Sequence, residues 1–168
     1  MADRNSLDCR ILSALFKNSR ISDRRLARIL GVSQPTVTRR RARLEKELID
    51  GYTIVPKWEE IGFEIAAFTF IKGRREFLER GKLKEALEKA KQWLSKQPNV
   101  LFAGAGEGMG WDGVMISFHK SYSDFSRFKM EHDMELSDII TESRSFLVEI
   151  NPKIALKPFH LKYLAEVK

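Results

Sequence analysis

The sequence predicts an α+β protein in two parts, a basic three-helix unit followed by a domain of order βαββαβ. The hydrophobic pattern changes along the chain: three amphipathic helical segments precede residue 48, and bulky strand-like segments appear from Glu64 onward. Charge divides the chain at the same place. Residues 1–50 hold 12 Lys and Arg against 6 Asp and Glu, whereas the remaining residues hold 18 against 17. Almost all of the net charge of +7 therefore lies in the helical part.

The first helix is expected from Leu7 to Lys17, after a capping Ser6. A serine hydroxyl can accept hydrogen bonds from the free amides of a helix start, and the apolar residues that follow recur at helical spacing. The side chains expected to face inward are Leu7, Ile11, Leu12 and Leu15.

Residues 21–48, ISDRRLARILGVSQPTVTRRRARLEKEL, predict two more helices joined by a Gly-Val-Ser turn. Ser22 caps the first of them, and its Leu26, Ala27 and Leu30 share one face. Gly31 can adopt the positive φ that the turn requires. Ser33 is expected to cap the second helix, in whose first turn a proline, Pro35, is tolerated, and its expected buried face is Val37, Leu44 and Leu48. The pattern is that of a helix-turn-helix, which presents its second helix to the major groove of DNA.

The charged residues of this segment are almost all arginines. Eight arginines and one acid, Asp23, lie between Arg20 and Arg43, without a lysine. A guanidinium group can bond phosphate oxygens or the guanine edge through two parallel hydrogen bonds, so we expect double-stranded DNA as a partner rather than a merely solvated face. Arg20 and the arginines of the helix that Ser22 caps suit phosphates. The arginines of the helix that Ser33 is expected to cap suit bases. The expected contacts are Ser22, Arg24, Arg25, Arg28, Ser33, Gln34, Thr36, Arg39, Arg40 and Arg43.

A turn at Asp50-Gly51 and a short strand over Tyr52–Val55 predict a small wing, so the N-terminal part is expected to be a winged helix-turn-helix. Residues 56–62 are expected to form a linker or one helical turn. We therefore expect domains over residues 1–60 and 61–168, with a tail from residue 151 in the second.

The second domain has the order expected of a ferredoxin-like fold, two helices on one face of an antiparallel sheet. The expected elements are a strand at 64–72, a helix at 83–94, strands at 100–105 and 114–118, a helix capped by Ser121 or Ser123, and a strand at 139–150. In the first strand Ala66, Phe68 and Phe70 alternate with other apolar residues, so both faces of the sheet should be buried. We expect a symmetric dimer or a higher oligomer through residues 64–150.

The stretch from Leu7 to Val55, followed by Ile61-Gly62 and the strand at Glu64, resembles the Lrp/AsnC family of feast/famine transcription regulators. The resemblance implies a sequence-specific, dimeric transcription regulator with a ferredoxin-like regulatory and oligomerisation domain that in many members binds an amino acid. Since a two-fold dimer presents two equivalent recognition helices, we expect its DNA site to be an inverted repeat. It places a candidate effector site at the glycine-rich turn, with residues Gly108, Gly110, Trp111 and Asp112. A hairpin that uses these residues for turn geometry alone is the alternative.

Three features depart from the family pattern. Arg41 stands where an apolar residue is usual, so its side chain should snorkel or reach a phosphate. The turn GAGEGMGWDG is longer and richer in glycine than the family's Gly-x-x-Asp turn. The tail after Asn151 is also long.

Two other classes of function compete with a regulator. A siroheme decarboxylase-like enzyme has the same two-domain fold, but the His-Tyr-Asn stretch typical of those enzymes is absent at the glycine-rich turn. An RNA-binding or purely oligomeric module is the other alternative, although the second domain is nearly neutral and lacks the aromatic strand motif of RNA readers. We therefore do not expect an enzyme.

No metal site, catalytic residue or cofactor is expected. The three histidines lack ligand spacing, and Gly108, Gly110 and Gly113 satisfy G-x-G-x-x-G before a strand instead of a helix, which excludes a dinucleotide fingerprint. The single cysteine, Cys9, fits a reducing compartment. With no signal-peptide pattern and no long apolar stretch, we expect a cytoplasmic protein without membrane contact.

Overall fold

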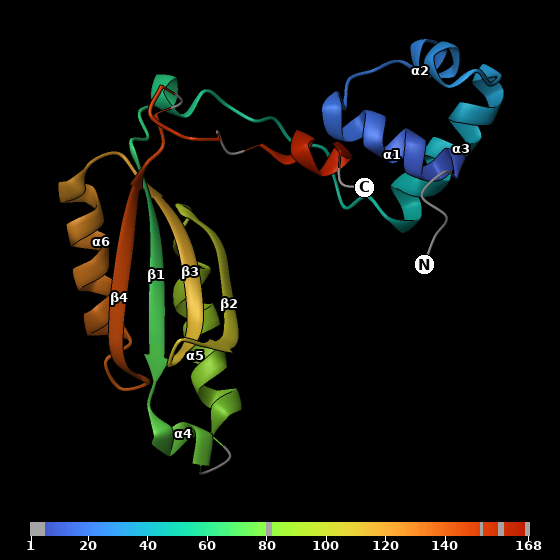
Figure 1. The fold of residues 1–168 in the computed structure, drawn as a ribbon. Coiled ribbons are helices and arrows are strands. Elements are labelled where there is room, and N and C mark those ends of the chain that lie inside the picture. The colour runs from blue at the N-terminus through green and yellow to red at the C-terminus, as the bar shows by residue number, and fades with distance from the viewer. Residues whose placement is uncertain (1–5, 80–81, 152, 158–159, 167–168) are drawn as a thin grey trace. The chain divides into compact units, whose positions relative to one another are not determined.

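The computed structural model describes residues 6–79, 82–151, 153–157 and 160–166, which form two compact units. The helical unit consists of the described residues up to Val55 and those from 160 onward, and the sheet unit consists of residues 56–157 (Figure 1). We expected the domain boundary at residue 60 and the whole tail in the second domain, and the structure differs from both expectations. The chain enters the sheet unit at Pro56, and a 3-10 helix, η2 (Leu161–Glu166), packs against the first helix of the helical unit.

The helical unit contains α1 (Leu7–Lys17), α2 (Asp23–Leu30) and α3 (Gln34–Glu47), close to the ranges expected from the sequence. Their apolar stripes meet in one core, because each helix repeats apolar residues at three- and four-residue spacing. The buried members of this core are Ile11, Leu15, Ile21, Leu26, Ala27, Leu30, Val37 and Leu44. Ser13 on α1 donates a 2.9 Å hydrogen bond to the carbonyl of Ala165, which fastens η2 to this unit.

The helix ends of the helical unit confirm two of its three predicted serine caps, and Ser121 caps α6 (Tyr122–Glu135) in the sheet unit. The hydroxyl oxygens of Ser6 and Ser22 accept hydrogen bonds from the amides of residues three positions on, and Gly31 has φ +71° in the tight turn. The prediction for Ser33 was wrong in its detail: its hydroxyl contacts the Thr36 hydroxyl at 2.8 Å instead of capping an amide. Leu48 was also wrongly expected inside, because α3 ends at Glu47 and this side chain is 67% exposed.

The segment expected to form the strand of a wing has no regular secondary structure. Tyr52–Val55 carries no strand, and Ile54 is 80% exposed. A two-stranded wing needs a partner strand, and the described residues of the helical unit provide none. The expected helical turn in the linker is present as η1 (Trp58–Ile61).

The sheet unit has the predicted order of elements with an added short helix, α4. Its four strands form one antiparallel sheet in the order β2-β3-β1-β4, and α5 and α6 lie on one side of it (Figure 1). The elements are β1 (Ile65–Gly73), α4 (Arg75–Glu79), α5 (Leu83–Leu94), β2 (Val100–Gly108), β3 (Trp111–His119), α6 (Tyr122–Glu135) and β4 (Ile140–Glu149).

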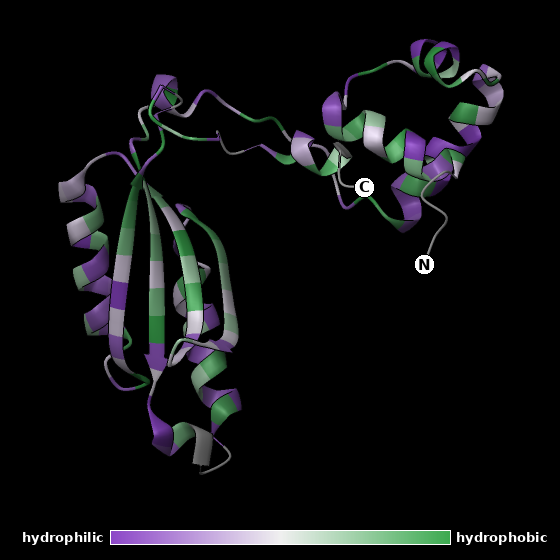
Figure 2. Cartoon of the chain, in the orientation of Figure 1, coloured by the Kyte–Doolittle hydropathy of each residue, from purple (hydrophilic) through white to green (hydrophobic). Residues whose placement is uncertain are grey.

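The two faces of the sheet differ in what covers them. One face packs on the helices through Met115, together with Trp93 of α5 and Phe128 of α6. On the opposite face, neighbouring strands pair Phe68 with Phe146, and Figure 2 shows β1 as hydrophobic along most of its length. Phe146 is 65% exposed, so this apolar open face is left uncovered by the described residues of the sheet unit.

The glycine-rich turn is much tighter than expected. The two strands extend until Gly108 pairs with Trp111, which leaves a two-residue turn of Met109 and Gly110. Both turn residues have positive φ, +51° and +77°, as a hairpin turn that follows strand twist requires. The extra glycines fall within β2, where the register shifts between Ala105 and Gly108.

Candidate nucleic-acid interface

The exposed side of α2 is a cationic surface. Arg24, Arg25 and Arg28 are all exposed, and with Ser22 they line an open hollow of about 630 Å³. The buried residues of α2 fill the opposite side of the helix, which forces these three side chains toward solvent. Ser22 itself is occupied as the cap, since its oxygen accepts a 3.3 Å hydrogen bond from the amide of Arg25. The hollow is suited to phosphate oxygens.

The predicted reading residues of α3 fall into two groups. Gln34 and Arg39 are exposed. Arg40 and Arg43 instead turn back toward Asp8 in the first turn of α1: Arg40 donates to Asp8 at 2.9 Å, and Arg43 also pairs with it. Contact of these two guanidinium groups with DNA therefore competes with their pairing to Asp8, although each group has further N–H donors. Their restraint by Asp8 was not visible in the sequence pattern.

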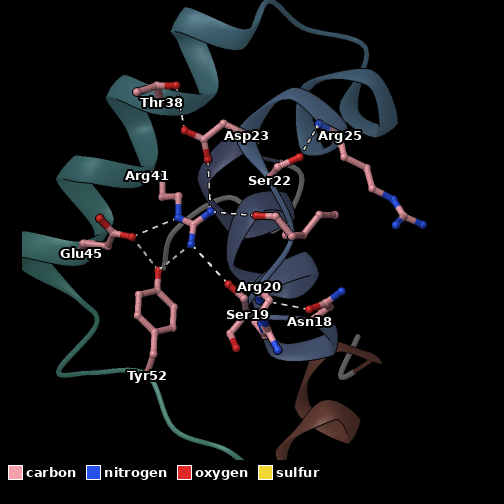
Figure 3. Close-up of polar contacts among 11 residues, drawn as sticks. Asn18, Ser19, Arg20, Ser22, Asp23, Arg25, Thr38, Arg41, Glu45 and Tyr52 are labelled. Carbon is pink, nitrogen blue, oxygen red and sulfur yellow. Dashed lines mark hydrogen bonds and ion pairs between the residues drawn. The ribbon is translucent and has the colours of Figure 1, made fainter.

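Arg41 is the centre of a polar network inside the helical unit (Figure 3). It donates to the carbonyl of Ile21 at 2.9 Å, to Asp23 at 3.1 Å and to Glu45 at 3.0 Å. Longer hydrogen bonds reach the Ser19 carbonyl and the Tyr52 hydroxyl. The side chain is only 18% exposed, so the expectation that it would snorkel or reach a phosphate was wrong. The partners supplied by three separate segments draw it inward.

The hydrogen bonds of this network favour the charged forms of Arg41 and Glu45. Burial lowers the pKa of the Arg41 guanidinium, but hydrogen bonds with Glu45, Tyr52 and Asp23 outweigh burial and raise it. The hydrogen bonds from Tyr52 and Arg41 lower the pKa of Glu45. Arg41 therefore fixes the start of α2 and the segment after α3 against the face of α3, and sets the spacing of the two helices that carry the exposed arginines.

The candidate effector residues lie at the turn end of the β2–β3 hairpin. Gly108 and Gly110 are exposed, and Trp111 packs against Phe70 with ring centroids 6.2 Å apart. Asp112 accepts a 2.9 Å hydrogen bond from the amide of Gly73, which gives this carboxylate a structural role at the end of β1. The Arg144 guanidinium lies 5.9 Å from the centre of the Trp111 ring. Arg144 lies within β4 and belongs to no sequence motif, so the sequence did not indicate it.

Two of the three histidines lie in the interior of the sheet unit. His119 and His132 are buried in the sheet unit, where burial lowers the pKa of each imidazole. Within the described ranges, no three His, Cys, Asp or Glu side chains come together as metal ligands. None of the described helices has the length and apolar character needed to cross a membrane.

Comparisons with known proteins agree with this geometry. The AsnC-type helix-turn-helix domain family matches residues 5–45. An HTH-type transcriptional regulator of Pyrococcus abyssi is 31% identical over 127 residues, covering 74% of this chain and 78% of the relative. The HTH-type transcriptional regulator Ptr1 of Methanocaldococcus jannaschii is 32% identical over 132 residues, covering 78% and 81%.

The fold is shared with a solved regulator structure. The transcriptional regulator NMB0573 of Neisseria meningitidis, solved as a complex with L-Met, superposes with a TM-score of 0.73 at 24% identity and covers 84% of this chain and 86% of that one. The chain belongs to the Lrp/AsnC family of helix-turn-helix transcriptional regulators. It is a DNA-binding transcription regulator, a function that the relatives favour over the siroheme decarboxylase-like and RNA-binding alternatives.

Proposed function

We propose that the chain binds an inverted-repeat DNA duplex as a symmetric dimer, and that a small effector such as an amino acid modulates this binding. The observation that carries the proposal is the outward row of arginines on α2 beside the exposed Gln34 and Arg39 of α3. In a helix-turn-helix the second helix reads base edges while the first helix meets the backbone.

The two helices have different tasks in this proposal. Arg39, with Gln34 and Thr36, reads bases, and Arg40 and Arg43 join them when DNA displaces Asp8. A good bidentate contact to a base is worth about 1–3 kcal/mol of discrimination. The residues proposed to meet phosphates or support that contact are Ser22, Arg24, Arg25, Arg28 and Ser33. Phosphate contacts act alike on every sequence and steepen the salt dependence.

A comparison of three variants tests these roles. The affinities of Arg39→Ala, Arg43→Ala and Arg25→Ala are measured on a selected duplex and on a random duplex across salt concentrations. Arg39→Ala and Arg43→Ala should lose discrimination, whereas Arg25→Ala should weaken both affinities and lower the salt slope by about one. Arg127→Ala, an exposed arginine on α6, is the matched control. Equal losses on both duplexes for all three variants contradict the assignment.

The dimer is proposed to form through the open face of the sheet. Phe68, Phe70, Phe102, Ile116 and Phe146 occupy register positions on that side, and Phe102 and Phe146 are 53% and 65% exposed. Apolar area of this kind is what subunit interfaces bury. A two-fold dimer presents two equivalent α3 helices, so the half-sites are related by a dyad and lie about 10–10.5 bp apart or a multiple of that distance.

Footprinting on a selected duplex tests the symmetry. We expect protection of two related half-sites and loss of affinity when a few base pairs are inserted between them, because the second helix then faces the wrong side of the duplex. Protection of a single half-site, or affinity that ignores the spacing, contradicts the proposal.

The effector is proposed to bind at the hairpin end formed by Gly108, Gly110, Trp111 and Asp112. The related Neisseria regulator was solved with L-Met, which supports an amino acid as the class of ligand. Asp112 uses one oxygen for the amide of Gly73, and the second oxygen can accept a hydrogen bond from an ammonium group. Amino acids are screened by thermal shift on the wild type and Asp112→Ala. A shift that survives unchanged in Asp112→Ala removes this site from the proposal.

A further inference from the structure

The helical unit contains a hollow that the DNA-binding surface does not use. Its volume is about 540 Å³, within the range of small-molecule sites. Its walls come from three separate pieces of the unit: the second half of α1 with the residues that follow it, residues 48–55 after α3, and residues 160–161.

The wall of this cavity is mainly apolar and open to a ligand. Leu12, Leu15 and Phe16 contribute from α1, and Ile54 and Leu161 from the other two pieces. Several of these side chains are unusually exposed for their type, with Phe16 at 43%, Leu161 at 47% and Ile54 at 80%. Binding of a small apolar group would remove this surface from water, which is favourable.

The charges at the cavity favour an anion. Lys17 and Arg20 line it against a single acid, Asp50. His160 also lines it, and its Nδ1 accepts a 2.9 Å hydrogen bond from the amide of Lys162. The neutral ring therefore carries its hydrogen on Nε2 and is a donor there. Arginine can hold a carboxylate through two parallel hydrogen bonds.

Tyr52 connects the cavity to α3. Tyr52 lines the cavity, donates a 2.7 Å hydrogen bond to Glu45 of α3, and lies within hydrogen-bonding distance of Arg41. A ligand that favours one position of Tyr52 therefore acts on the network that sets the spacing of α2 and α3. Only such a difference in affinity between two arrangements can shift their equilibrium.

We propose that this cavity binds a small amphipathic carboxylate, with its apolar group against Leu12, Leu15 and Phe16 and its carboxylate at Arg20. This site lies in the helical unit and is separate from the amino-acid site proposed at the β2–β3 hairpin. Its occupancy changes DNA affinity through Tyr52.

The full chain is titrated with phenylacetate and, separately, with neutral phenylacetamide, and amide proton–nitrogen NMR spectra are recorded. Phenylacetate should shift the amides of Ser19, Gly51 and Tyr52, and it should bind more tightly than phenylacetamide. Arg20→Gln should weaken phenylacetate binding about tenfold and leave phenylacetamide binding unchanged. Ile54→Glu, at a largely exposed position on the rim, should weaken phenylacetate in the same way. Arg127→Gln, an equal loss of charge on α6 of the sheet unit, should have no effect.

The same titration decides against the proposal in three ways. If phenylacetate and phenylacetamide bind with equal affinity, the site does not recognise a carboxylate. Shifts confined to the sheet unit place the probe elsewhere. If Arg20→Gln loses affinity for a random duplex and still binds phenylacetate like the wild type, Arg20 is a phosphate contact instead. The coupling has its own readout: phenylacetate should change the duplex affinity of the wild type and leave that of Tyr52→Phe unchanged, because this variant lacks the hydroxyl bonded to Glu45.

Discussion

Asp8 in the first turn of α1 accepts a 2.9 Å hydrogen bond from Arg40 in the middle of α3. The same carboxylate also pairs with Arg43 one turn later. An acid at this position favours the start of α1 through the helix dipole, and it neutralises part of the cationic surface of the neighbouring helix. Two of the arginines that we propose as base-reading residues are therefore paired with an acid inside the helical unit.

Asp8→Asn should release both arginines. We expect tighter binding to a random duplex and a salt slope steeper by about one for each guanidinium gained, because more phosphates are then neutralised. Discrimination between the selected and random duplexes should fall. Asp50→Asn, which removes one negative charge after α3, serves as the control for net charge. Weaker binding by Asp8→Asn on both duplexes means that Asp8 positions the arginines for contact.

Arg41→Met should destabilise the helical unit by about 1–3 kcal/mol, since it leaves Asp23 and the Ile21 carbonyl without their donor. The three tryptophans all lie in the sheet unit, so their fluorescence reports that unit alone. Denaturation is followed by tryptophan fluorescence and by circular dichroism of the helices. Because α5 and α6 also contribute to the dichroism, only the part of the dichroism transition that fluorescence does not follow should move to lower denaturant, while the fluorescence transition stays in place. Arg39→Met, at an exposed position, should move neither.

Phe146→Glu should convert the proposed dimer into folded monomers, because it places a charge on the open sheet face beside Phe68. Sedimentation velocity of the full chain measures the change. Met134→Glu, on the exposed side of α6, should leave the dimer intact. Dimers of unchanged stability in Phe146→Glu would assign assembly to another surface.

The sheet unit should lose stability as the pH falls below 6.5. Burial is the main cause of the lowered pKa of His119 and His132, and nearby Asp124 and Asp133 oppose it only in part. The folded state therefore binds protons less readily than the unfolded state, so stability is complete above the unfolded pKa of about 6.5 and decreases as pH falls through the folded pKa. Denaturation midpoints from tryptophan fluorescence, measured between about pH 7.5 and pH 5, should decrease.

His132→Gln tests the source of this pH dependence. Glutamine is neutral throughout the range, so the decrease in midpoint should become smaller. Burial of His132 leaves its Nε2 without a hydrogen-bond partner among the described residues, which makes protonation there costly. A variant with the same pH dependence as the wild type would exclude His132 as a source.

The sequence predicted best those elements whose pattern is local. The ranges of α1 and α5 followed from apolar spacing, and the start of α1 also followed from the capping residue Ser6. The exposed arginines of α2 followed from the same spacing, because a helix that buries Leu26, Ala27 and Leu30 on one face exposes the residues of the opposite face. Local patterns also separated the two units approximately.

What depended on distant partners could not be predicted. Arg41 was identified as unusual, but its inward position requires acceptors from Ser19, Ile21 and Asp23 that only the folded chain brings near it. The tight hairpin was missed because glycines typical of loops are tolerated in β2, an edge strand with few side-chain contacts. The expected wing strand failed for the opposite reason, since Tyr52–Val55 has strand-like residues and no partner strand.

The packing of η2 against α1 has a consequence for synthesis on the ribosome. The helical unit is discontinuous in sequence: its last element, Leu161–Glu166, is made only after the whole sheet unit. During synthesis, the Ser13 hydroxyl of α1 therefore lacks its acceptor, the carbonyl of Ala165, until the strands of the sheet have been made. The packing of η2 against α1 therefore forms only when the strands of the sheet unit, through which we propose assembly, have already been synthesised.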